Sequence, residues 1–528
     1  MRDFQMPARS VALGTSGMVA TSNPQAAMAG IDVLRAGGNA IDAAVAIAAM
    51  LAVVEPTQTG IGGDCFVMLK IPGRKPIALD GSGWAPRSID VEKLRASGLA
   101  AIPSDSALAV TVPGAVAAWE RLLMDYGTRP LAELFAPAIK AAESGYVVTE
   151  RLARDWAKQG AKVAATPEAA EIFMKDGVAP KVGDRRSNPK LGCTLRTIAE
   201  RGAEAFYRGW IAEDIVAFLQ RLGGSHTLDD FAQYSPEYVE PISIEYRGYR
   251  LWECPPGGQG IVALQIAGML GQFDVSGMNP LGAERFHLHA ELSRLAYAQR
   301  DAYVADPRFG PVDVESMLSH RHLQRLTATF DRDRRHGNLT PPQIPEHRDT
   351  VYISVVDKDG TVVSFINSIF DDFGSGLVAP LSGVLLHSRG CGFVLDEGHP
   401  NVIQGRKRPM HTIIPALLTQ RDDAVMSFGV TGGHFQPSGQ VQILSNVVDF
   451  GMSVQQAIDH PRVFARGNSF EVERPVPWGV RQALQSRGHV LSEAENSLGT
   501  CHAVYIDRER GVLFGGSDGR RDGLAIGY

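Results

Sequence analysis

The sequence predicts a fold that mixes α-helices and β-strands, on three observations. The chain has 528 residues, of which 44% are hydrophobic, so it can bury a large core, and its length alone would allow about three domains. Apolar residues recur at helical spacing in several segments before residue 331. Runs rich in β-branched residues gather after Thr350.

Helices are predicted where apolar residues recur every three or four positions along one face. The predicted helices are 24–36, 40–54, 132–143, 195–201, 211–222 and 285–303. Gly37 and Gly38 are expected to end the first one. The apolar stretch 43–54 is about a dozen residues long, shorter than the roughly 20 that cross a bilayer, so we expect a buried helix and no membrane partner.

Strands are predicted at 350–357, 361–369, 383–387, 425–430, 502–506 and 511–515. The first two form a hairpin, because residues 358–360 (Lys-Asp-Gly) fit a three-residue loop whose glycine is left-handed. Pairing of Asp357 with Thr361 then places Thr350 opposite Ser368, with Cβ atoms about 4.5–5.5 Å apart on one face. On spacing alone, a Thr and a Ser on the solvent side of a strand pair is the more ordinary interpretation.

The hairpin follows a polar linker at about 331–349, which consists mostly of charged residues, Pro, Gly and His. A strand that begins abruptly after such a segment, with Thr350 at its start, suggests a cleavage point between Asp349 and Thr350.

The run that starts at Thr350 (Thr-x-x-x-Ser-Val-Val-Asp-Lys-Asp-Gly) is similar to the start of the small subunit of γ-glutamyltranspeptidases, which are N-terminal nucleophile hydrolases. Further blocks match the family in order along nearly the whole chain. They are 36–44, 55–56, 60–63, 112–115, 246–249, 255–258, 298–301, 374–376, 407–409, 431–433, 461–462 and 515–518. The resemblance implies an α+β fold, a four-layer αββα sandwich, in which segments 1–349 and 350–528 interleave into one globular unit after self-cleavage.

The resemblance also implies a mechanism. The Thr350 hydroxyl attacks the preceding carbonyl, and hydrolysis of the resulting ester frees an α-amine, which titrates near 7.7–8.0 and can act as a general base. Ser368 matches the family's second hydroxyl, which orients the nucleophile. Gly432 and Gly433 match a pair of backbone N–H donors for the oxyanion, although an ordinary loop after Phe428 is the alternative.

Two charged residues of true γ-glutamyl enzymes are missing here. Ser82 stands where they place an arginine for the substrate's α-carboxylate, and Gly392 stands where they place an aspartate for its α-amino group. A buried ammonium group without its counter-charge is costly. We therefore expect a substrate that lacks an α-amino group.

The replacements are cationic and hydrogen-bonding. Arg389 replaces a glutamine, Phe370 an asparagine, and His411 and Thr412 a pair of serines. Arg389 and His411 can bind a carboxylate through charge-assisted hydrogen bonds, while Phe370 would shrink the pocket. The alternatives are a solvated or structurally paired Arg389 and a loop histidine at 411 with its bonds satisfied.

These residues favour a small acidic amide as substrate. The resemblance extends to oxamate amidohydrolases, which convert a two-carbon amide acid to oxalate and ammonia. Hydrolysis or transfer of γ-glutamyl groups on glutathione-like substrates, acylase activity on larger side chains, and an unprocessed scaffold of the same fold remain alternatives. Asn367 should point to the opposite face of its strand from Ser368.

Other function classes find little support. A net charge of −6 gives no basic footprint for nucleic acid. Gly60-Ile-Gly-Gly63 lacks the third glycine of a dinucleotide loop, and His287 and His289 do not share a helix face, so no cofactor and no metal are expected. Five scattered cysteines and an N-terminus without an apolar run favour reduced thiols and a cytoplasmic location.

Overall fold

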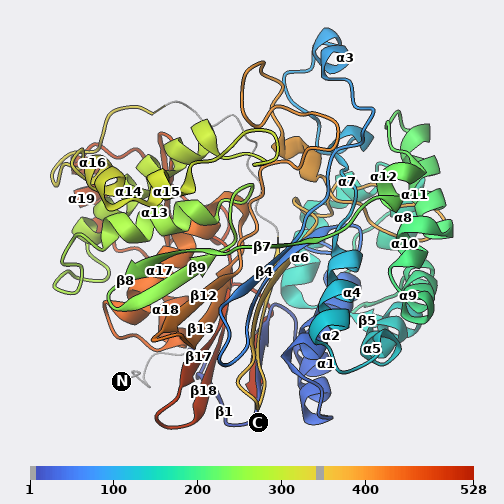
Figure 1. The fold of residues 1–528 in the computed structure, drawn as a ribbon, viewed down its shortest axis with the longest axis horizontal. Coiled ribbons are helices and arrows are strands. Elements are labelled where there is room, and N and C mark those ends of the chain that lie inside the picture. Colours follow the sequence, from blue (N-terminus) through green and yellow to red (C-terminus); the bar gives the residue numbers. More distant parts are fainter. Residues whose placement is uncertain (1–7, 340–349) are drawn as a thin grey trace.

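The computed structural model describes residues 8–339 and 350–528, so Asp349, on one side of the expected cleavage point, lies outside the described residues. Two seven-stranded antiparallel sheets stack face to face, and helices cover the outer face of each (Figure 1). The expected four-layer α+β sandwich is confirmed.

Sheet 1 contains the predicted hairpin and takes strands from both sides of the linker. Its order is β19 (Leu524–Gly527), β2 (Met18–Thr21), β10 (Val351–Val356), β11 (Val362–Ser368), β3 (Asp64–Lys70), β4 (Ile77–Gly81) and β7 (Glu237–Val239). The hairpin therefore lies between β2 and β3, with hydrogen-bonded neighbours from the first segment on both sides.

Sheet 2 is also built from both segments. Its order is β1 (Ala12–Gly14), β18 (Val512–Ser517), β17 (Cys501–Asp507), β13 (Asp423–Val430), β12 (Ala416–Gln420), β9 (Tyr249–Glu253) and β8 (Ile242–Tyr246). Its inner face packs on sheet 1 through a buried apolar layer that includes Phe66, Tyr352, Ile366, Leu417 and Val504.

The outer helices divide between the two sheets (Figure 1). Those over sheet 1 are α1 (Pro24–Arg35), α2 (Ala40–Val54) and α4 (Ala115–Tyr126), backed by α5 (Leu131–Ser144) and α9 (Pro189–Arg201). Those over sheet 2 are α13 (Gly260–Leu270), α14 (Ala283–Tyr303), α15 (Val314–Leu318), α16 (His320–Thr327), α17 (Gln436–Val448) and α18 (Val454–Asp459).

Shorter elements surround these layers. They are α3 (Val91–Ala96), α6 (Glu150–Lys158), α7 (Gly160–Val163), α8 (Pro167–Phe173), α10 (Glu204–Arg208), α11 (Trp210–Arg221), α12 (Leu228–Ala232), α19 (Trp478–Ser486), β5 (Tyr146–Val147), β6 (Arg185–Arg186), β14 (Val463–Arg466), β15 (Ser469–Val472) and β16 (Leu491–Glu493).

All six predicted helices are present, and α2 shows why its sequence forms one. The Asn39 side chain accepts hydrogen bonds at the start of the helix, and the Asp42 side chain accepts from the Asn39 backbone N–H, which closes a capping box. Every residue of α2 is buried, as expected for the stretch 43–54. Gly37 ends the preceding helix with φ +87°, a conformation that glycine adopts at no steric cost.

One expectation about strands is wrong. Residues 383–387 form only isolated bridges, of Leu385 with Val378 and of Leu386 with Gly62, rather than a strand. Strands are denser after Thr350, as expected, but β3, β4, β8 and β9 of the two main sheets lie in the first segment and were not predicted. Each residue of β3 is buried, so its sequence lacks the alternation that marks a half-exposed strand.

In the described part of the chain, no helix combines the length and the apolar character needed to cross a bilayer.

Candidate active site

The hairpin has the predicted register. β10 pairs with β11 from Val351–Asn367 to Val356–Val362, and the Asp357 N–H donates to the Thr361 carbonyl at 3.1 Å. The loop glycine, Gly360, has φ +79°. Local turn chemistry was therefore sufficient to align two strands without knowledge of the rest of the fold.

Thr350 and Ser368 meet in the protein interior. Their exposed fractions are 1% and 0%, so the solvent-side interpretation is wrong. The Thr350 hydroxyl donates to Ser368 Oγ at 3.3 Å, and Ser368 Oγ also accepts from the Phe370 N–H at 2.9 Å. Asn367 points elsewhere, since its amide donates to Thr59 Oγ1 at 2.7 Å.

The backbone nitrogen of Thr350 also has a partner in the first segment. It donates to Gln58 Oε1 at 3.2 Å, and the Gln58 amide donates in turn to Asp372 Oδ1 at 2.7 Å. Gln58 lies between two family blocks, 55–56 and 60–63, and that position was the only sequence signal that could have identified it.

The two glycines of the expected oxyanion pair follow β13. Gly432 has φ +103° and Gly433 has φ +56°. A Cβ on Gly432 would lie 2.9 Å from the Gly499 Cα, so the turn requires glycine for space as well as for conformation.

Contacts between the sheets bring β13, which precedes this turn, against β10, which follows Thr350. Ser354 Oγ donates to the Ser427 carbonyl at 3.3 Å, and a Cβ on Gly429 would overlap the Tyr352 ring.

One amide joins this turn to the expected substrate residues. Gln259 Nε2 donates to the Thr412 carbonyl at 2.7 Å and to the Gly433 carbonyl at 2.8 Å. Arg300 Nη1 holds the other end of the amide, 2.6 Å from Gln259 Oε1. Gln259, which sequence analysis missed, follows the 255–258 block.

Arg389 lies at the centre of the substrate residues and is 0% exposed. Its Nη1 donates to Thr412 Oγ1 at 3.1 Å, and its guanidinium carbon lies 4.7 Å from the centre of the Phe370 ring. Nε and Nη2 form no hydrogen bond with any described residue. Burial, opposed by Asp64, lowers the pKa of Arg389 to about 10, so the residue stays charged near neutral pH. A solvated Arg389 is thus wrong.

Phe370 adopts an unusual backbone conformation, with φ +83°. A bulky residue in this region costs about 1–3 kcal/mol and persists only where its surroundings enforce it. Its ring is buried under Arg389, so the strained backbone places an aromatic face against the cation.

Asp64, which sequence analysis missed, opens β3 opposite Ser368. Its Oδ1 accepts from the N–H groups of Gly83 at 3.2 Å and Gly114 at 3.1 Å. Burial, opposed by Arg389, raises the pKa of Asp64 to about 7. An acid directly after Gly60-Ile-Gly-Gly63 was the available signal.

The other carboxylate oxygen of Asp64, Oδ2, faces three basic side chains. It lies 3.5 Å from His387 Nδ1, 3.6 Å from His411 Nε2 and 4.0 Å from Arg389 Nε. All three distances exceed those of good hydrogen bonds, so Arg389 has a nearby counter-charge but no tight ion pair.

Ser82 and Gly392, which replace charged residues of γ-glutamyl enzymes, form hydrogen bonds within the protein. Ser82 is buried and its hydroxyl donates to Asp80 Oδ1 at 2.5 Å, while Asp80 also pairs with Arg408 at 3.3 Å. The Gly392 carbonyl accepts from Asn401 Nδ2 at 2.7 Å. Neither position places a charged side chain of its own in the site.

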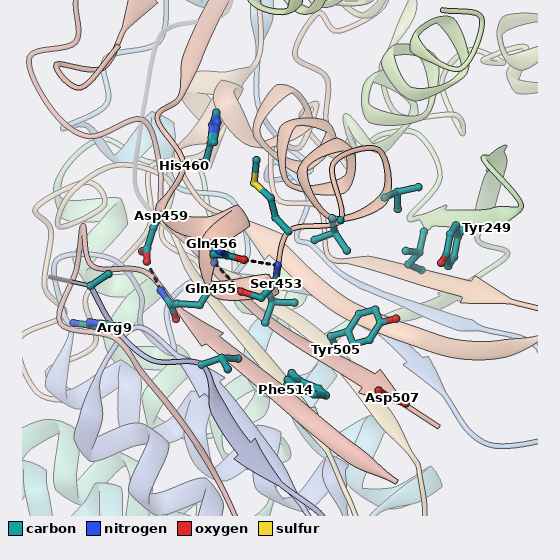
Figure 2. Close-up of a pocket in the computed structure, with 18 of the residues that line it drawn as sticks. Arg9, Tyr249, Ser453, Gln455, Gln456, Asp459, His460, Tyr505, Asp507 and Phe514 are labelled. Carbon is teal, nitrogen blue, oxygen red and sulfur yellow. Dashed lines mark hydrogen bonds between the residues drawn. The ribbon is translucent and has the colours of Figure 1, made fainter. Parts of the chain in front are cut away.

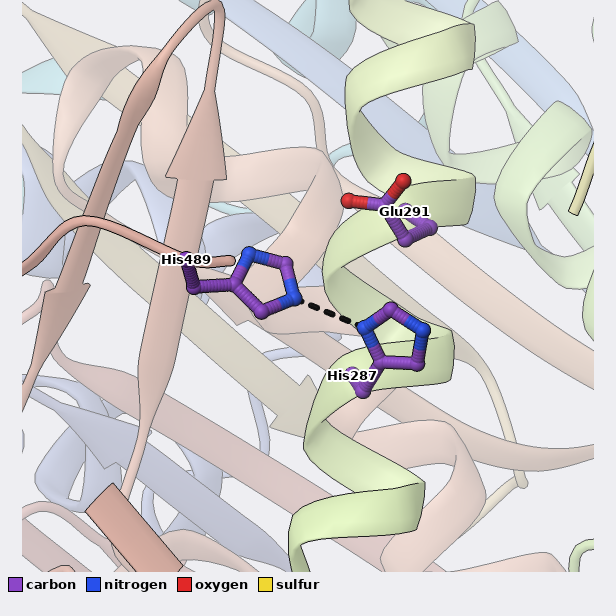
Figure 3. Close-up of side chains that lie close together, drawn as sticks. All are labelled: His287, Glu291 and His489. Carbon is purple, nitrogen blue, oxygen red and sulfur yellow. Dashed lines mark hydrogen bonds between the residues drawn. The ribbon is translucent and has the colours of Figure 1, made fainter. Parts of the chain in front are cut away.

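One described group of side chains has ligand atoms close enough to hold a metal ion: His287, Glu291 and His489 (Figure 3). His287 Nδ1 lies 2.7 Å from His489 Nε2, and Glu291 is already paired with Arg294 at 2.8 Å. Burial and then nearby cations, including Arg294, lower the pKa of His489 to about 3. The carboxylate of this group, Glu291, thus already has a cationic partner.

This group instead holds the start of the polar linker. His287 Nε2 lies 2.8 Å from the Asp331 carbonyl, and the His336 N–H donates to Glu291 Oε2 at 2.5 Å. His289 faces Ser438 Oγ at 2.9 Å, so the two histidines of α14 point to different neighbours, as expected from their spacing.

A large cavity of about 880 Å³ lies away from the residues of the Thr350 site (Figure 2). Its lining includes Tyr249, Tyr505 and Phe514 from sheet 2 and Gln455 and Asp459 from α18. It contains none of the predicted site residues. Volume alone is therefore a poor guide to the reactive centre here.

Comparisons with known proteins agree with this geometry. A family model described as gamma-glutamyltranspeptidase matches residues 26–528. The chain is 37% identical to the "Glutathione hydrolase-like YwrD proenzyme" of Bacillus subtilis (strain 168), over 98% of this chain and 99% of that protein. It is 34% identical to the "Oxamate amidohydrolase proenzyme" of Klebsiella pneumoniae, again over 98% and 99%.

Solved structures give the same picture. The crystal structure of a cephalosporin acylase from Bacillus halodurans is 40% identical, with a TM-score of 0.93 over 100% of this chain and 99% of the acylase.

Proposed function

The chain belongs to the γ-glutamyltranspeptidase family of N-terminal nucleophile hydrolases, and on that premise we propose that it is a self-processing amidohydrolase that cleaves a small carboxylate-bearing amide through Thr350. The best candidate reaction is hydrolysis of oxamate to oxalate and ammonia.

Processing precedes catalysis. The Thr350 hydroxyl attacks the Asp349 carbonyl, the acyl group moves from nitrogen to oxygen, and water hydrolyses the ester. The products are segment 1–349, with a new carboxylate, and segment 350–528, with a free α-amine. The two remain together as a heterodimer, because each sheet contains strands of both.

Catalysis then uses the hairpin. The freed Thr350 amine, held by Gln58 Oε1, takes the proton of the Thr350 hydroxyl as Oγ attacks the substrate carbonyl. Ser368 orients the nucleophile through its 3.3 Å hydrogen bond. The N–H groups of Gly432 and Gly433 stabilise the oxyanion, the amine passes its proton to the leaving nitrogen, and water releases the acid.

The buried guanidinium of Arg389 carries the substrate assignment. Two of its nitrogens have no hydrogen-bond partner among the described residues, although the residue is fully buried. Leaving a buried charged donor unsatisfied is costly, and a substrate carboxylate would supply the missing acceptors in a bidentate geometry. His411 and Thr412 line the same side, and Phe370 limits the length of the acyl group.

A second candidate is acylase activity on a larger amide whose acyl part carries a carboxylate, favoured by the similarity to the Bacillus halodurans acylase. Such a substrate would use the same arginine but would need more space than Phe370 leaves. Glutathione-like substrates are less favoured, since Ser82 and Gly392 offer no charge to an α-amino acid.

Electrophoresis under denaturing conditions tests processing. We expect two fragments, the smaller of which begins at Thr350, and a single intact chain would instead support an unprocessed scaffold. Ammonia release from oxamate, compared with product release from a γ-glutamyl anilide and from a longer N-acyl amine, then ranks the substrates. Equal or faster turnover of the γ-glutamyl compound would contradict the oxamate assignment.

We also propose a cytoplasmic location for this enzyme. All five cysteines are unpaired, which fits a reducing compartment.

A further inference from the structure

Two proton acceptors face each other beside Arg389. His387 Nε2 lies 2.8 Å from the Thr111 carbonyl, which can only accept, so this nitrogen carries the ring proton. In a neutral imidazole the other nitrogen, Nδ1, then has a lone pair, and it points at Asp64 Oδ2 at 3.5 Å. A lone pair and a carboxylate oxygen at this distance repel each other unless a proton lies between them.

The environment decides which partner holds that proton. Burial, together with the nearby Arg389 and His226, lowers the pKa of His387 to about 3, so the histidine stays neutral. Burial raises the pKa of Asp64 to about 7. The shared proton therefore belongs to Asp64.

From this geometry we propose that Asp64 is a specificity-determining residue whose protonation controls whether Arg389 can bind an anionic substrate. When Asp64 is neutral, Arg389 is an uncompensated buried cation with two vacant donor groups. When Asp64 is ionised, it neutralises Arg389 and repels an incoming carboxylate. The inference deepens the proposed function and rests on it.

Binding of an anion beside Arg389 is coupled to the uptake of one proton. An ionised Asp64 and a substrate carboxylate cannot both be stabilised by the single charge of Arg389 in a buried site. Binding of the anion at alkaline pH therefore takes one proton from solvent onto Asp64, and that proton returns when the acid product leaves.

Two other titratable groups lie close to Asp64. His411 faces the same oxygen at 3.6 Å, and Asp80, on the neighbouring strand β4, raises the pKa of Asp64. Asp80 is paired with Arg408, so its own charge is balanced.

Nearby weak acids remain neutral in the relevant range. Burial raises the pKa of the Cys65 thiol and of the Tyr207 and Tyr234 phenols well above their ordinary values. These thiol and phenol groups therefore do not exchange protons with Asp64 near neutral pH.

Calorimetry on the processed enzyme provides the test, with propionate as the carboxylate probe and propionamide as its neutral counterpart. Titrations in two buffers of different ionisation enthalpy count the protons taken up on binding. Above the titration midpoint of Asp64, we expect propionate to bind with uptake of about one proton and to weaken about tenfold per pH unit. Propionamide should show neither effect.

Asp64→Asn mimics the neutral acid and keeps the oxygen that accepts from Gly83 and Gly114. We expect this variant to bind propionate without proton uptake and with an affinity that no longer falls at alkaline pH. Glu253→Gln is the matched control. Glu253 is also fully buried, and burial raises its pKa as well, but without a contribution from a nearby charge. It should behave as the wild type.

The outcomes separate the two levels of the argument. Propionate binding without proton uptake in the wild type, or uptake that persists in Asp64→Asn, would overturn this inference and leave the proposed function standing. Persistent uptake would assign the proton to another group, such as the Thr350 amine. Failure of propionate to bind both below and above the titration midpoint of Asp64 would overturn this inference and the proposed function.

Discussion

The hairpin that carries Thr350 and the pocket around Arg389 belong to one proposed site. They differ in how many of their polar groups have hydrogen-bond partners within the protein. In the hairpin, Thr350 and Ser368 bond to each other, and Gln58 holds the Thr350 nitrogen. In the pocket, Nε and Nη2 of Arg389 have no hydrogen-bond partner among the described residues. The hairpin is thus organised before substrate arrives, whereas the pocket is completed by the substrate.

The largest effect is expected from Thr350→Ala, which removes the reactive hydroxyl of the hairpin. We predict complete loss of self-cleavage and of amide hydrolysis, measured by denaturing electrophoresis and ammonia release. Thr350→Ser should still cleave, because it keeps a hydroxyl and can expose an amine. Thr361→Ala, at the loop end of the same hairpin, should be processed normally, and cleavage in Thr350→Ala would refute the mechanism.

Arg389→Ala should affect only the pocket, and not the hairpin. We expect normal processing and loss of about 2–4 kcal/mol of carboxylate binding, a rise in KM for acidic amides of roughly 30- to 1,000-fold. Steady-state kinetics on an acidic amide and its neutral analogue measure this, and the neutral analogue should be unaffected. Unchanged affinity for every acidic amide would show that Arg389 is only structural.

Ser368→Ala removes a hydrogen-bond partner of the nucleophile but keeps the Thr350 hydroxyl. Because Ser368 Oγ accepts from Thr350, we predict slower self-cleavage and a kcat lower by about 10- to 100-fold, with little change in KM. Ser364 on the same strand bonds the Tyr352 hydroxyl instead, so Ser364→Ala serves as the control. A change confined to KM would contradict an orienting role.

The smallest effect is on stability. Asp64 has a folded-state pKa of about 7, above its ordinary value near 3.9. Its contribution to stability is therefore complete below about pH 4 and is lost as pH rises through 7. Asp64→Asn should match the wild-type Tm at pH 4 and exceed it by a few degrees at pH 8, as measured by thermal unfolding. Equal values at both pH values would place the Asp64 titration elsewhere.

The same contrast decides what the sequence could predict. The hairpin depends on neighbours in the chain, so a glycine loop and strand pairing were sufficient to place Thr350 opposite Ser368. The resemblance then added Gly432, Gly433 and Arg389 as candidate site residues.

The pocket depends on contacts between distant segments. Asp64 meets His387 and Arg389 across more than 300 positions, at the start of a strand that is buried on both faces and lacks alternation. Residues 383–387, which precede Arg389, resemble a strand in composition but pass Gly62 with isolated bridges. No local pattern could have assigned these residues to one site.

If the chain is cleaved before Thr350 as proposed, the interleaved sheets make unfolding of the mature enzyme kinetically hard to reverse. While the linker is intact, it keeps the strands β10 and β11 at a high effective concentration beside β2 and β3, so an opened molecule can close again. Once the linker is cut, an unfolded mature enzyme must recover its partner by collision between two chains. Its lifetime in solution is then governed by the barrier to opening rather than by an equilibrium, and the intact precursor should refold from denaturant far more readily than the enzyme that it becomes.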